Sequence, residues 1–321
     1  MTDTGMRGRR IGVLAGGLSE EAGVSLVSGQ GVVEALRSVG CDAHLVVLDH
    51  QDPGTVLKES GIEVAFPVTH GIYGEDGCLQ GVLEWMGIPY VGSGVLSSAL
   101  AMNKTVANAI LKTRGLPVPE GVTIDTEDPD ALSKINAALA ARPVCIKPNA
   151  GGSSVGIELV DEPADRAAAL ARIAKVAKRV LVEEKVEGVE VTVGTLDDRP
   201  LGSTEIEPLN SFYDFHHKYT KGASRYHSPA RIPAEQERLL MDWAGQAIRA
   251  LGCSGGCRVD FIVGPGRVAL LEVNTLPGMT AMSLLPMCAG LAGISYEQLC
   301  LQMLDRARLE RQPREAPTPG A

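Results

Sequence analysis

The sequence predicts an α/β protein whose first part is a parallel sheet covered by helices, followed by two further units of mixed strands and helices. Short apolar runs alternate with helical patterns in the first third of the chain, whereas later segments run helix, strand, loop and strand. A chain of 321 residues with 45% hydrophobic content can bury the cores of two or three domains. The sequence is therefore typical of a globular protein with several domains.

The N-terminal unit opens with an apolar strand at 11–15, a Gly-Gly turn and a helix that ends near residue 40. Further strands are expected at 45–48, 64–68 and 89–91. This order is typical of a parallel sheet with helices on both faces, and such sheets bind ligands at the carboxyl ends of their strands.

Polar segments follow three of these strands, at 19–21, 70–77 and 92–94. His70 and Glu75 lie in a glycine-rich loop after an apolar strand, a position that favours a functional role. An ordinary turn is the alternative interpretation for each segment.

A second, smaller unit is expected from residue 93 to 187, with a proline-rich turn at 116–119. Its strand at 143–148 carries Lys147 near its end and runs into the small-residue loop 149–156. Successive backbone N–H groups in such a loop can bind phosphate, although a surface hairpin is the alternative. The chain has neither a Walker sequence nor a Rossmann fingerprint, which argues against a P-loop enzyme.

A strand at 180–186 leads into the third unit, which begins at Gly188. Strands are expected at 190–194 and 203–207, and a helix at 235–251. The connection from 208 to 233 is too long for a simple loop, and its segment 212–219 mixes aromatic and charged residues. This composition favours a lid over a site, with a surface excursion as the alternative. The adjacent His216 and His217 cannot both face one metal ion in an extended chain.

The most informative segment is a hairpin formed by 258–261 and 270–274 around a Gly-Pro-Gly turn. Strand alternation predicts a polar face of Arg258, Asp260, Glu272 and Asn274, and an apolar face of Val259, Phe261, Leu271 and Val273. Two carboxylates and an amide oxygen suit Mg²⁺, and the guanidinium beside them suits an anion. A solvated polar face is the alternative.

Composition excludes several classes of function. A net charge of −9 and 4% aromatic residues argue against binding to nucleic acid. No apolar run approaches the ~20 residues that span a membrane. Seven cysteines with no apolar signal segment before residue 11 indicate reduced thiols and a cytoplasmic location. Cys253 and Cys257 lack the partners of a zinc site.

Several segments together resemble the signatures of bacterial D-alanine:D-alanine ligases, in the same order and spacing. They are residues 16–21, 70–77, 151–156, 212–219 and 272–280. The resemblance extends from residue 11 to about 308 and implies a three-domain ATP-grasp architecture. It implies an N-terminal domain at 1–92, a central domain at 93–187 and a C-terminal domain at 188–312, before a flexible tail at 313–321. It also implies a homodimer that serves peptidoglycan synthesis.

The resemblance implies a role for individual residues. ATP phosphates would contact Lys104, Lys147 and Lys218, under a loop carrying Ser153 and Ser154. The remaining ATP-binding residues would be Glu183, Glu184, Val186, Glu190 and Phe212. Two Mg²⁺ ions, with Mn²⁺ as a substitute, would bind Asp260, Glu272 and Asn274. The first D-alanine would meet Glu21, Val24 and His70, with Ser153 and Tyr219 in the same hydrogen-bond set. Arg258 and the amide of Gly278 would stabilise the tetrahedral intermediate, and Ser283 and Leu284 would bind the second D-alanine.

The implied reaction converts the first D-alanine to an acyl phosphate, which the amine of the second D-alanine attacks. Two positions depart from the family pattern: Ala22-Gly23 after the first-domain glutamate, and Lys185 where an aromatic residue often flanks adenine. The alternatives are a D-alanine:D-lactate ligase, a carboxylase of the biotin-dependent type, and an ATP-binding regulatory protein. Lys218-Tyr219 follows the dipeptide-forming pattern and favours D-alanine as the second substrate.

Overall fold

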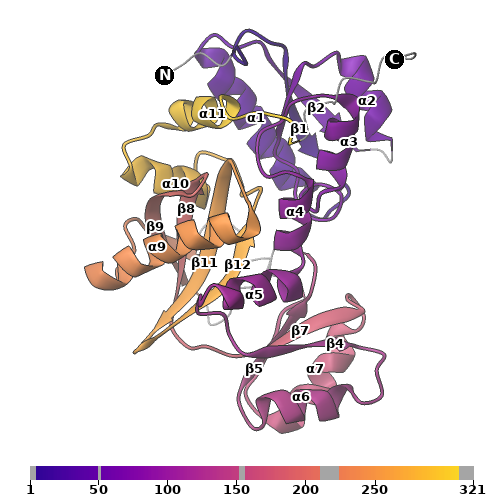
Figure 1. Ribbon diagram of the computed structural model, residues 1–321, viewed down its shortest axis with the longest axis vertical. Coiled ribbons are helices and arrows are strands. Elements are labelled where there is room, and N and C mark those ends of the chain that lie inside the picture. Colours follow the sequence, from indigo (N-terminus) through magenta and orange to yellow (C-terminus); the bar gives the residue numbers. More distant parts are fainter. Residues whose placement is uncertain (1–4, 50–51, 152–155, 210–223, 311–321) are drawn as a thin grey trace, which may run out of the picture.

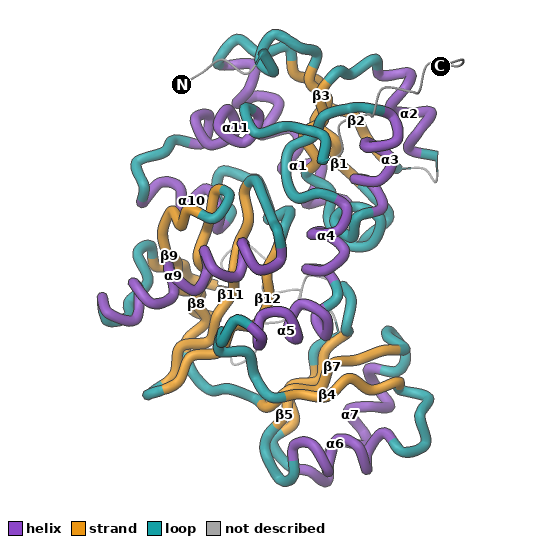
Figure 2. The backbone as a smooth tube through the Cα atoms, viewed as in Figure 1, coloured by secondary structure: helices purple, strands orange, loops and turns teal. Residues whose placement is uncertain are grey.

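The computed structural model describes residues 5–49, 52–151, 156–209 and 224–310, which form three β-sheets with their helices (Figures 1 and 2). The strand orders are β2-β1-β3, β4-β7-β5-β6 and β10-β9-β8-β11-β12. The first sheet is parallel and the other two are antiparallel. The predicted α/β class and the parallel N-terminal sheet are confirmed.

The N-terminal sheet is covered by helices on both faces, as predicted. Its elements are β1 (Ile11–Gly16), α1 (Ala22–Ser38), β2 (Ala43–Leu48), α2 (Pro53–Ser60), β3 (Val64–Pro67) and α3 (Cys78–Met86). Ile11 and Val13 of β1 pack with α1 and with α11 (Tyr296–Leu304), whereas Leu14 packs with α2 and α3. This two-sided burial follows from strand alternation, which sends successive side chains to opposite faces.

The expected strand at 89–91 is reduced to a single parallel bridge between Tyr90 and Ala65. Pro89 has no backbone N–H and therefore accepts a hydrogen bond from Ala65 without donating one. On its other side Tyr90 exchanges backbone hydrogen bonds of 3.1 and 3.2 Å with Arg308. The end of the described chain thus joins the edge of the first sheet.

The central sheet has one apolar face and one face toward a cavity. Its elements are β4 (Gly121–Asp125), α6 (Ala131–Leu139), β5 (Val144–Pro148), β6 (Glu158–Val160), η1 (Pro163–Asp165), α7 (Arg166–Ile173) and β7 (Arg179–Glu184). Val144, Ile146, Val180 and Val182 join α6 and α7 in one cluster. Alternation therefore sends Lys147 and Glu183 to the opposite face.

The third sheet forms the largest layer. Its elements are β8 (Val189–Leu196), β9 (Arg199–Pro208), β10 (Ser224–His227), α9 (Ala234–Leu251), β11 (Gly256–Gly264), β12 (Arg267–Asn274) and α10 (Leu284–Leu291). One face packs with α9 and also with α4 (Val95–Met102) and α5 (Lys104–Thr113). Helix α10 covers the other face closely, since a Cβ at Gly194 would come within 2.6 Å of Cys288.

The β11–β12 hairpin forms as predicted, with Arg258 opposite Asn274 and Asp260 opposite Glu272. An irregularity then pairs Phe261 with Leu270, so that Leu271 has no counterpart. The prediction that Leu271 belongs to the apolar face is therefore wrong: Leu271 lines the cavity. The extra residue of a bulge shifts the alternation of one strand relative to its partner.

Among the described residues, no single helix is long and apolar enough to cross a membrane. Helices α10 and α11 meet that test of length and composition only as a pair, bent by 101°.

Candidate functional site

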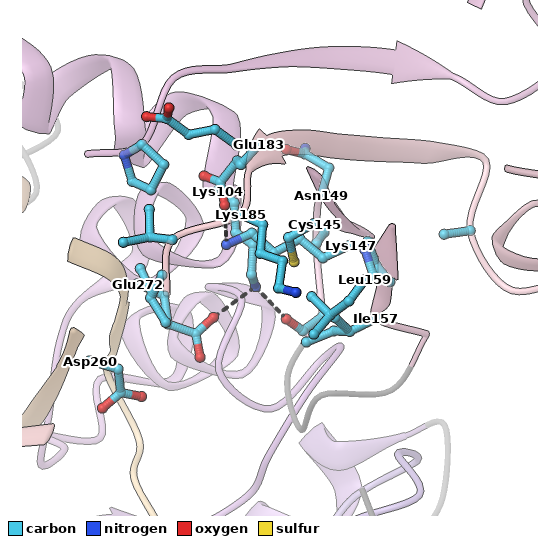
Figure 3. Close-up of a pocket in the computed structure, with 18 of the residues that line it drawn as sticks. Lys104, Cys145, Lys147, Asn149, Ile157, Leu159, Glu183, Lys185, Asp260 and Glu272 are labelled. Carbon is cyan, nitrogen blue, oxygen red and sulfur yellow. Dashed lines mark hydrogen bonds and ion pairs between the residues drawn. The ribbon is translucent and has the colours of Figure 1, made fainter. Parts of the chain in front are cut away.

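A cavity of about 650 Å³ lies between the central sheet and the β11–β12 hairpin. Figure 3 shows that its labelled polar residues come from separate elements, and a dashed line joins Lys104 to Glu272. Lys104 comes from α5, Lys147 from β5, Glu183 from β7, and Asp260 and Glu272 from the hairpin. The structure thus brings these five predicted site residues together in a space of the size that small-molecule ligands occupy.

Lys104 and Lys147 supply buried positive charge to this cavity. The Lys104 ammonium lies 3.1 Å from Glu272 Oε2 and donates to the Gly151 carbonyl at 2.8 Å. The Lys147 ammonium lies 2.5 Å from Glu183 Oε2. Burial opposes the charge of Lys147, but Glu183, Cys145 and Glu272 together outweigh it and raise the pKa of Lys147 above its ordinary value. Lys147 therefore stays charged at neutral pH.

Asn149 holds the start of the loop after β5 against the first turn of α5. Its side-chain oxygen accepts hydrogen bonds from the Thr105 N–H, at 3.0 Å, and from the Thr105 hydroxyl. Its amide donates to Asn103 Oδ1 at 3.0 Å, and Asn103 in turn caps α5. The backbone that leads into the 151–156 loop is thereby fixed beside Lys104.

Glu183 has a second partner, which the sequence did not reveal. Asn108 of α5 donates from Nδ2 to Glu183 Oε1 at 2.7 Å, while Lys147 occupies Oε2. Both carboxylate oxygens of this buried residue are therefore satisfied by different elements.

Glu184 links the central sheet to the tip of the β11–β12 hairpin. Its carboxylate accepts hydrogen bonds from Arg267, from Arg142 at 3.2 Å and from the Glu120 N–H at 3.0 Å. Burial alone would raise the pKa of Glu184, but the bonds from Arg267 and Glu120 outweigh it and hold this pKa below the ordinary value of 4.5. A lowered carboxyl pKa contributes stability above pH 4.5 that is lost as the pH falls through the folded-state pKa.

Replacing Arg267 with Gln is expected to lower the free energy of unfolding by about 1 kcal/mol at pH 7, because it removes one charged donor from buried Glu184. Urea unfolding would measure this difference, which should shrink as the pH is lowered below 4.5, where Glu184 takes up a proton. Arg249→Gln serves as the control, since Arg249 and Asp198 form an exposed pair. Equal effects of the two substitutions would contradict a specific role for Arg267.

The end of the cavity beyond Glu184 combines polar and apolar groups. Val186 and Glu190 line it, as do Ile262 and Leu271. Lys185 lines it too, with its ammonium 2.6 Å from Asp161. Cys145 also faces the cavity, and burial raises the pKa of its thiol to about 11, so the thiol is neutral at pH 7.

The hairpin presents three oxygen donors that fit a divalent cation. Asp260 accepts from Arg258 Nη2 at 2.8 Å and from the Thr192 hydroxyl at 2.5 Å. Asn274 Oδ1 is buried and has no hydrogen-bond partner among the described residues. Two carboxylates and a free amide oxygen form a hard donor set of the kind that Mg²⁺ prefers. Thr192 could have been found from the sequence, because it lies two residues after Glu190 on the same strand.

A second group of predicted residues lies where the N-terminal sheet meets α10. Glu21 is buried at the start of α1, half-buried Val24 follows it, and buried His70 comes after β3. Ser25 ties these strand ends together, since its hydroxyl accepts from the Gly16 N–H at 2.9 Å and donates to the Val68 carbonyl at 2.8 Å. The polar residues Glu21 and His70 therefore lie at the carboxyl edge of the sheet, as predicted.

The loop before α10 faces α1. Ser28 of α1 accepts from the Met279 N–H at 3.3 Å, next to Gly278. Ser283 precedes α10 and accepts from the Thr280 N–H at 3.0 Å, and Leu284 begins the helix. The free N–H groups at a helix start favour a carboxylate.

Ser153, Ser154, Phe212, Lys218 and Tyr219 lie outside the described residues.

Comparison with known proteins points to one family. Models described as "D-ala D-ala ligase N-terminus" and "D-ala D-ala ligase C-terminus" match residues 50–93 and 110–305. A D-alanine–D-alanine ligase of Anaeromyxobacter sp. strain Fw109-5 is 46% identical over 304 residues, which cover 94% of this chain and 98% of that protein. The Geobacter sulfurreducens ligase is 47% identical over 315 residues, with coverages of 97% and 98%.

Solved structures agree with the sequence relatives. The D-alanine–D-alanine ligase from Bacillus anthracis complexed with ATP matches with a TM-score of 0.80 and 31% identity, covering 93% of this chain and 96% of that one. The VanG D-Ala:D-Ser ligase from Enterococcus faecalis matches with a TM-score of 0.79 and 32% identity, with coverages of 92% and 98%.

Proposed function

Because the chain belongs to the D-alanine–D-alanine ligase family, we propose that it joins two D-alanine molecules to D-alanyl-D-alanine, with conversion of ATP to ADP and phosphate. The observation that carries the proposal is a cavity lined by Lys104 and Lys147 together with the hairpin carboxylates Asp260 and Glu272. Its architecture is the three-domain ATP-grasp fold with an N-terminal parallel α/β domain.

The first step activates a carboxylate, which is a poor electrophile at neutral pH. A carboxylate oxygen of the first D-alanine attacks the γ-phosphorus of ATP, the bond to the ADP oxygen breaks, and an acyl phosphate forms. Lys104 and Lys147 hold phosphate oxygens and offset the charge that crowds around the reacting phosphorus. We place Mg²⁺, as two ions with Mn²⁺ as a substitute, on Asp260, Glu272 and Asn274, where it would supply further positive charge.

The second step forms the peptide bond. The neutral amine of the second D-alanine attacks the acyl carbon, loses a proton, and phosphate departs with the electrons of the carbon–oxygen bond. Arg258 is buried beside Asp260 and would stabilise the oxyanion together with the Gly278 N–H. Ser283 and the N–H of Leu284 would bind the carboxylate of this second D-alanine.

The first D-alanine is proposed to bind at the carboxyl edge of the N-terminal sheet. Glu21 would hold its ammonium, and His70 and Val24 would line its site. The contributions of Ser153 and Tyr219 rest on the family resemblance. A closed site around the acyl phosphate would exclude water, which otherwise hydrolyses it.

The nucleoside end of ATP is proposed to lie beside Glu183, the backbone of Glu184 and Val186, and Glu190. The apolar contacts of Ile262 and Leu271 suit a base, and an acidic side chain suits ribose hydroxyls. Roles for Ser154, Phe212 and Lys218 rest on the resemblance.

Several properties of the whole chain are likewise proposals. We propose a homodimer, which sedimentation velocity would distinguish from a monomer. We propose that the enzyme supplies peptidoglycan synthesis and is cytoplasmic, in keeping with its seven free cysteines. Detection of the enzyme in a membrane or secreted fraction would contradict the cytoplasmic location. The domain boundaries after residues 92, 187 and 312 remain predictions that limited proteolysis would test.

The purified protein is expected to release phosphate from ATP only when Mg²⁺ and D-alanine are both present, and to form D-alanyl-D-alanine. A phosphate assay with mass spectrometry of the products, run on a panel of D- and L-amino acids, measures both. L-alanine is the matched control, because it differs only in configuration. Equal turnover with L-alanine, or none with either isomer, would contradict the proposed reaction.

The identity of the second substrate needs a competition experiment, since one structural relative is a D-Ala:D-Ser ligase. We propose D-alanine over D-lactate, on the strength of Lys218-Tyr219 in the sequence. Equimolar D-alanine, D-serine and D-lactate would be offered together near neutral pH. A predominantly D-alanyl-D-alanine product supports the proposal, whereas a depsipeptide or a D-alanyl-D-serine product overturns it.

A further inference from the structure

We propose that Asn108 positions the nucleotide, acting through Glu183 and Lys147. The inference rests on the proposed function, because it concerns the same cavity. Asn108 Nδ2 donates to Glu183 Oε1 at 2.7 Å, and the Lys147 ammonium lies 2.5 Å from Glu183 Oε2. Glu183 and Lys147 both line the cavity, whereas Asn108 stands behind them. Asn108 is therefore a positioning residue and not a catalytic one.

Helix α5 connects the acidic residues on the two sides of the cavity. Lys104 and Asn108 are four residues apart and so lie on the same face of the helix. Lys104 contacts Glu272 of β12, whereas Asn108 contacts Glu183 of β7. Figure 1 shows α5 between the strands of the third sheet and those of the central sheet. One helix thus sets the positions of charged groups from both sheets.

Burial makes the contact with Asn108 specific. Glu183 is 2% exposed and Asn108 is 8% exposed, so water does not replace the amide readily. Without the amide, Oε1 of a buried carboxylate would lack a donor, which is costly in a site of low dielectric. The carboxylate would turn to share the Lys147 ammonium between both oxygens. The Lys147 ammonium would then no longer point toward the phosphate oxygen that it is proposed to bind.

The test begins with Asn108→Leu, which keeps most of the side-chain volume but removes the amide. Isothermal titration calorimetry with ATP and Mg²⁺, in the absence of D-alanine, is expected to show about tenfold weaker binding, equivalent to about 1.4 kcal/mol. The KM for ATP should rise by a similar factor, while the KM for D-alanine stays unchanged. This split distinguishes a positioning role from general damage to the fold.

Asn136→Leu is the matched control for lost stability. Asn136 lies in the central unit and accepts from buried Arg166 at 2.6 Å, so its loss also removes a hydrogen bond from a buried charged group. It is not among the described residues that line the cavity. This variant is expected to unfold at a lower temperature but to bind ATP as tightly as the unmodified protein.

A second pair of variants reverses the direction of the hydrogen bond. Asn108→Asp sets two carboxylates against each other and should weaken ATP binding more than Asn108→Leu does. Adding Glu183→Gln to Asn108→Asp restores a donor, because the new amide can donate to position 108 while its oxygen still faces Lys147. The double variant is expected to bind ATP more tightly than Asn108→Asp alone.

Three outcomes would overturn the proposal: unchanged ATP affinity in Asn108→Leu, equal loss of ATP affinity in Asn136→Leu, or no recovery in the double variant. Should Asn108→Leu fail to fold, the Asn108→Asp pair decides the question. Failure of the proposed ligase reaction would appear separately, as absence of dipeptide from the unmodified protein. Calorimetry without D-alanine therefore tests the role of Asn108 independently of the ligation chemistry.

Discussion

Asp260→Asn is expected to lower the rate of phosphate release by about 10²–10³-fold while the protein remains folded. The substitution keeps the shape of the side chain but removes its negative charge, which we propose holds Mg²⁺ next to the phosphates. It also ends the ion pair with Arg258, which lies 2.8 Å away. Glu272→Gln should lower the rate of phosphate release to a similar extent, because Glu272 lies directly opposite Asp260 on β12.

Phosphate release at saturating Mg²⁺ and D-alanine measures this effect, and the thermal unfolding midpoint shows that the fold survives. Asp242→Asn is the matched control, since exposed Asp242 on α9 contacts only Gln246 among the hydrogen-bond partners described for it. Unmodified turnover in Asp260→Asn or Glu272→Gln would show that the hairpin carries an ordinary polar surface.

Arg258→Met is expected to reduce dipeptide formation by about 10²–10³-fold, because it removes the cation proposed to stabilise the oxyanion of the second step. The first step should fall less, since Arg258 would influence it only through Asp260. Positional isotope exchange in ATP, in the presence of D-alanine, reports the first step separately from ligation. Arg238→Met, on the exposed side of α9, is the control.

Two results would count against this role of Arg258. An equal loss in exchange and in ligation would mean that Arg258 acts only by holding Asp260. Retention of ligation would mean that the guanidinium does not face the reacting carbon. This separation is necessary because the same guanidinium contacts Asp260, the carboxylate proposed to bind the metal.

The sequence predicted the parts of the site that depend on local periodicity. Alternation along one hairpin placed Arg258, Asp260, Glu272 and Asn274 on a common face, and the structure forms that hairpin. Leu271 was predicted wrongly because the position of a β-bulge depends on how the two strands pair, and local alternation in the sequence does not reveal it. The length of the strand at 89–91 was also overestimated, because Pro89 has no backbone N–H to donate to the neighbouring strand.

The residues that sequence reasoning missed are those whose roles depend on a distant partner. Asn108 is an ordinary polar residue of a helix until β7 places Glu183 beside it, 75 positions away in the chain. Asn149 likewise gains its role from the capped start of α5. A helix pattern also gave no sign that α4 and α5 would pack into the core of the third sheet. Such contacts follow from tertiary packing and not from propensity.

The cavity lining also has a consequence for how a nucleotide is attracted to it. Among the residues that the structure describes, the lining has as many cationic as acidic side chains: Lys104, Lys147, Lys178, Arg179 and Lys185 against Glu183, Glu184, Glu190, Asp260 and Glu272. Their formal charges cancel, on a chain whose total is −9. These described side chains therefore exert no net attraction on a bare polyphosphate at distances beyond the Debye length, about 8 Å at physiological ionic strength. These side chains therefore select their ligand through direct contacts. We expect them to bind a polyphosphate that arrives with its own counterions.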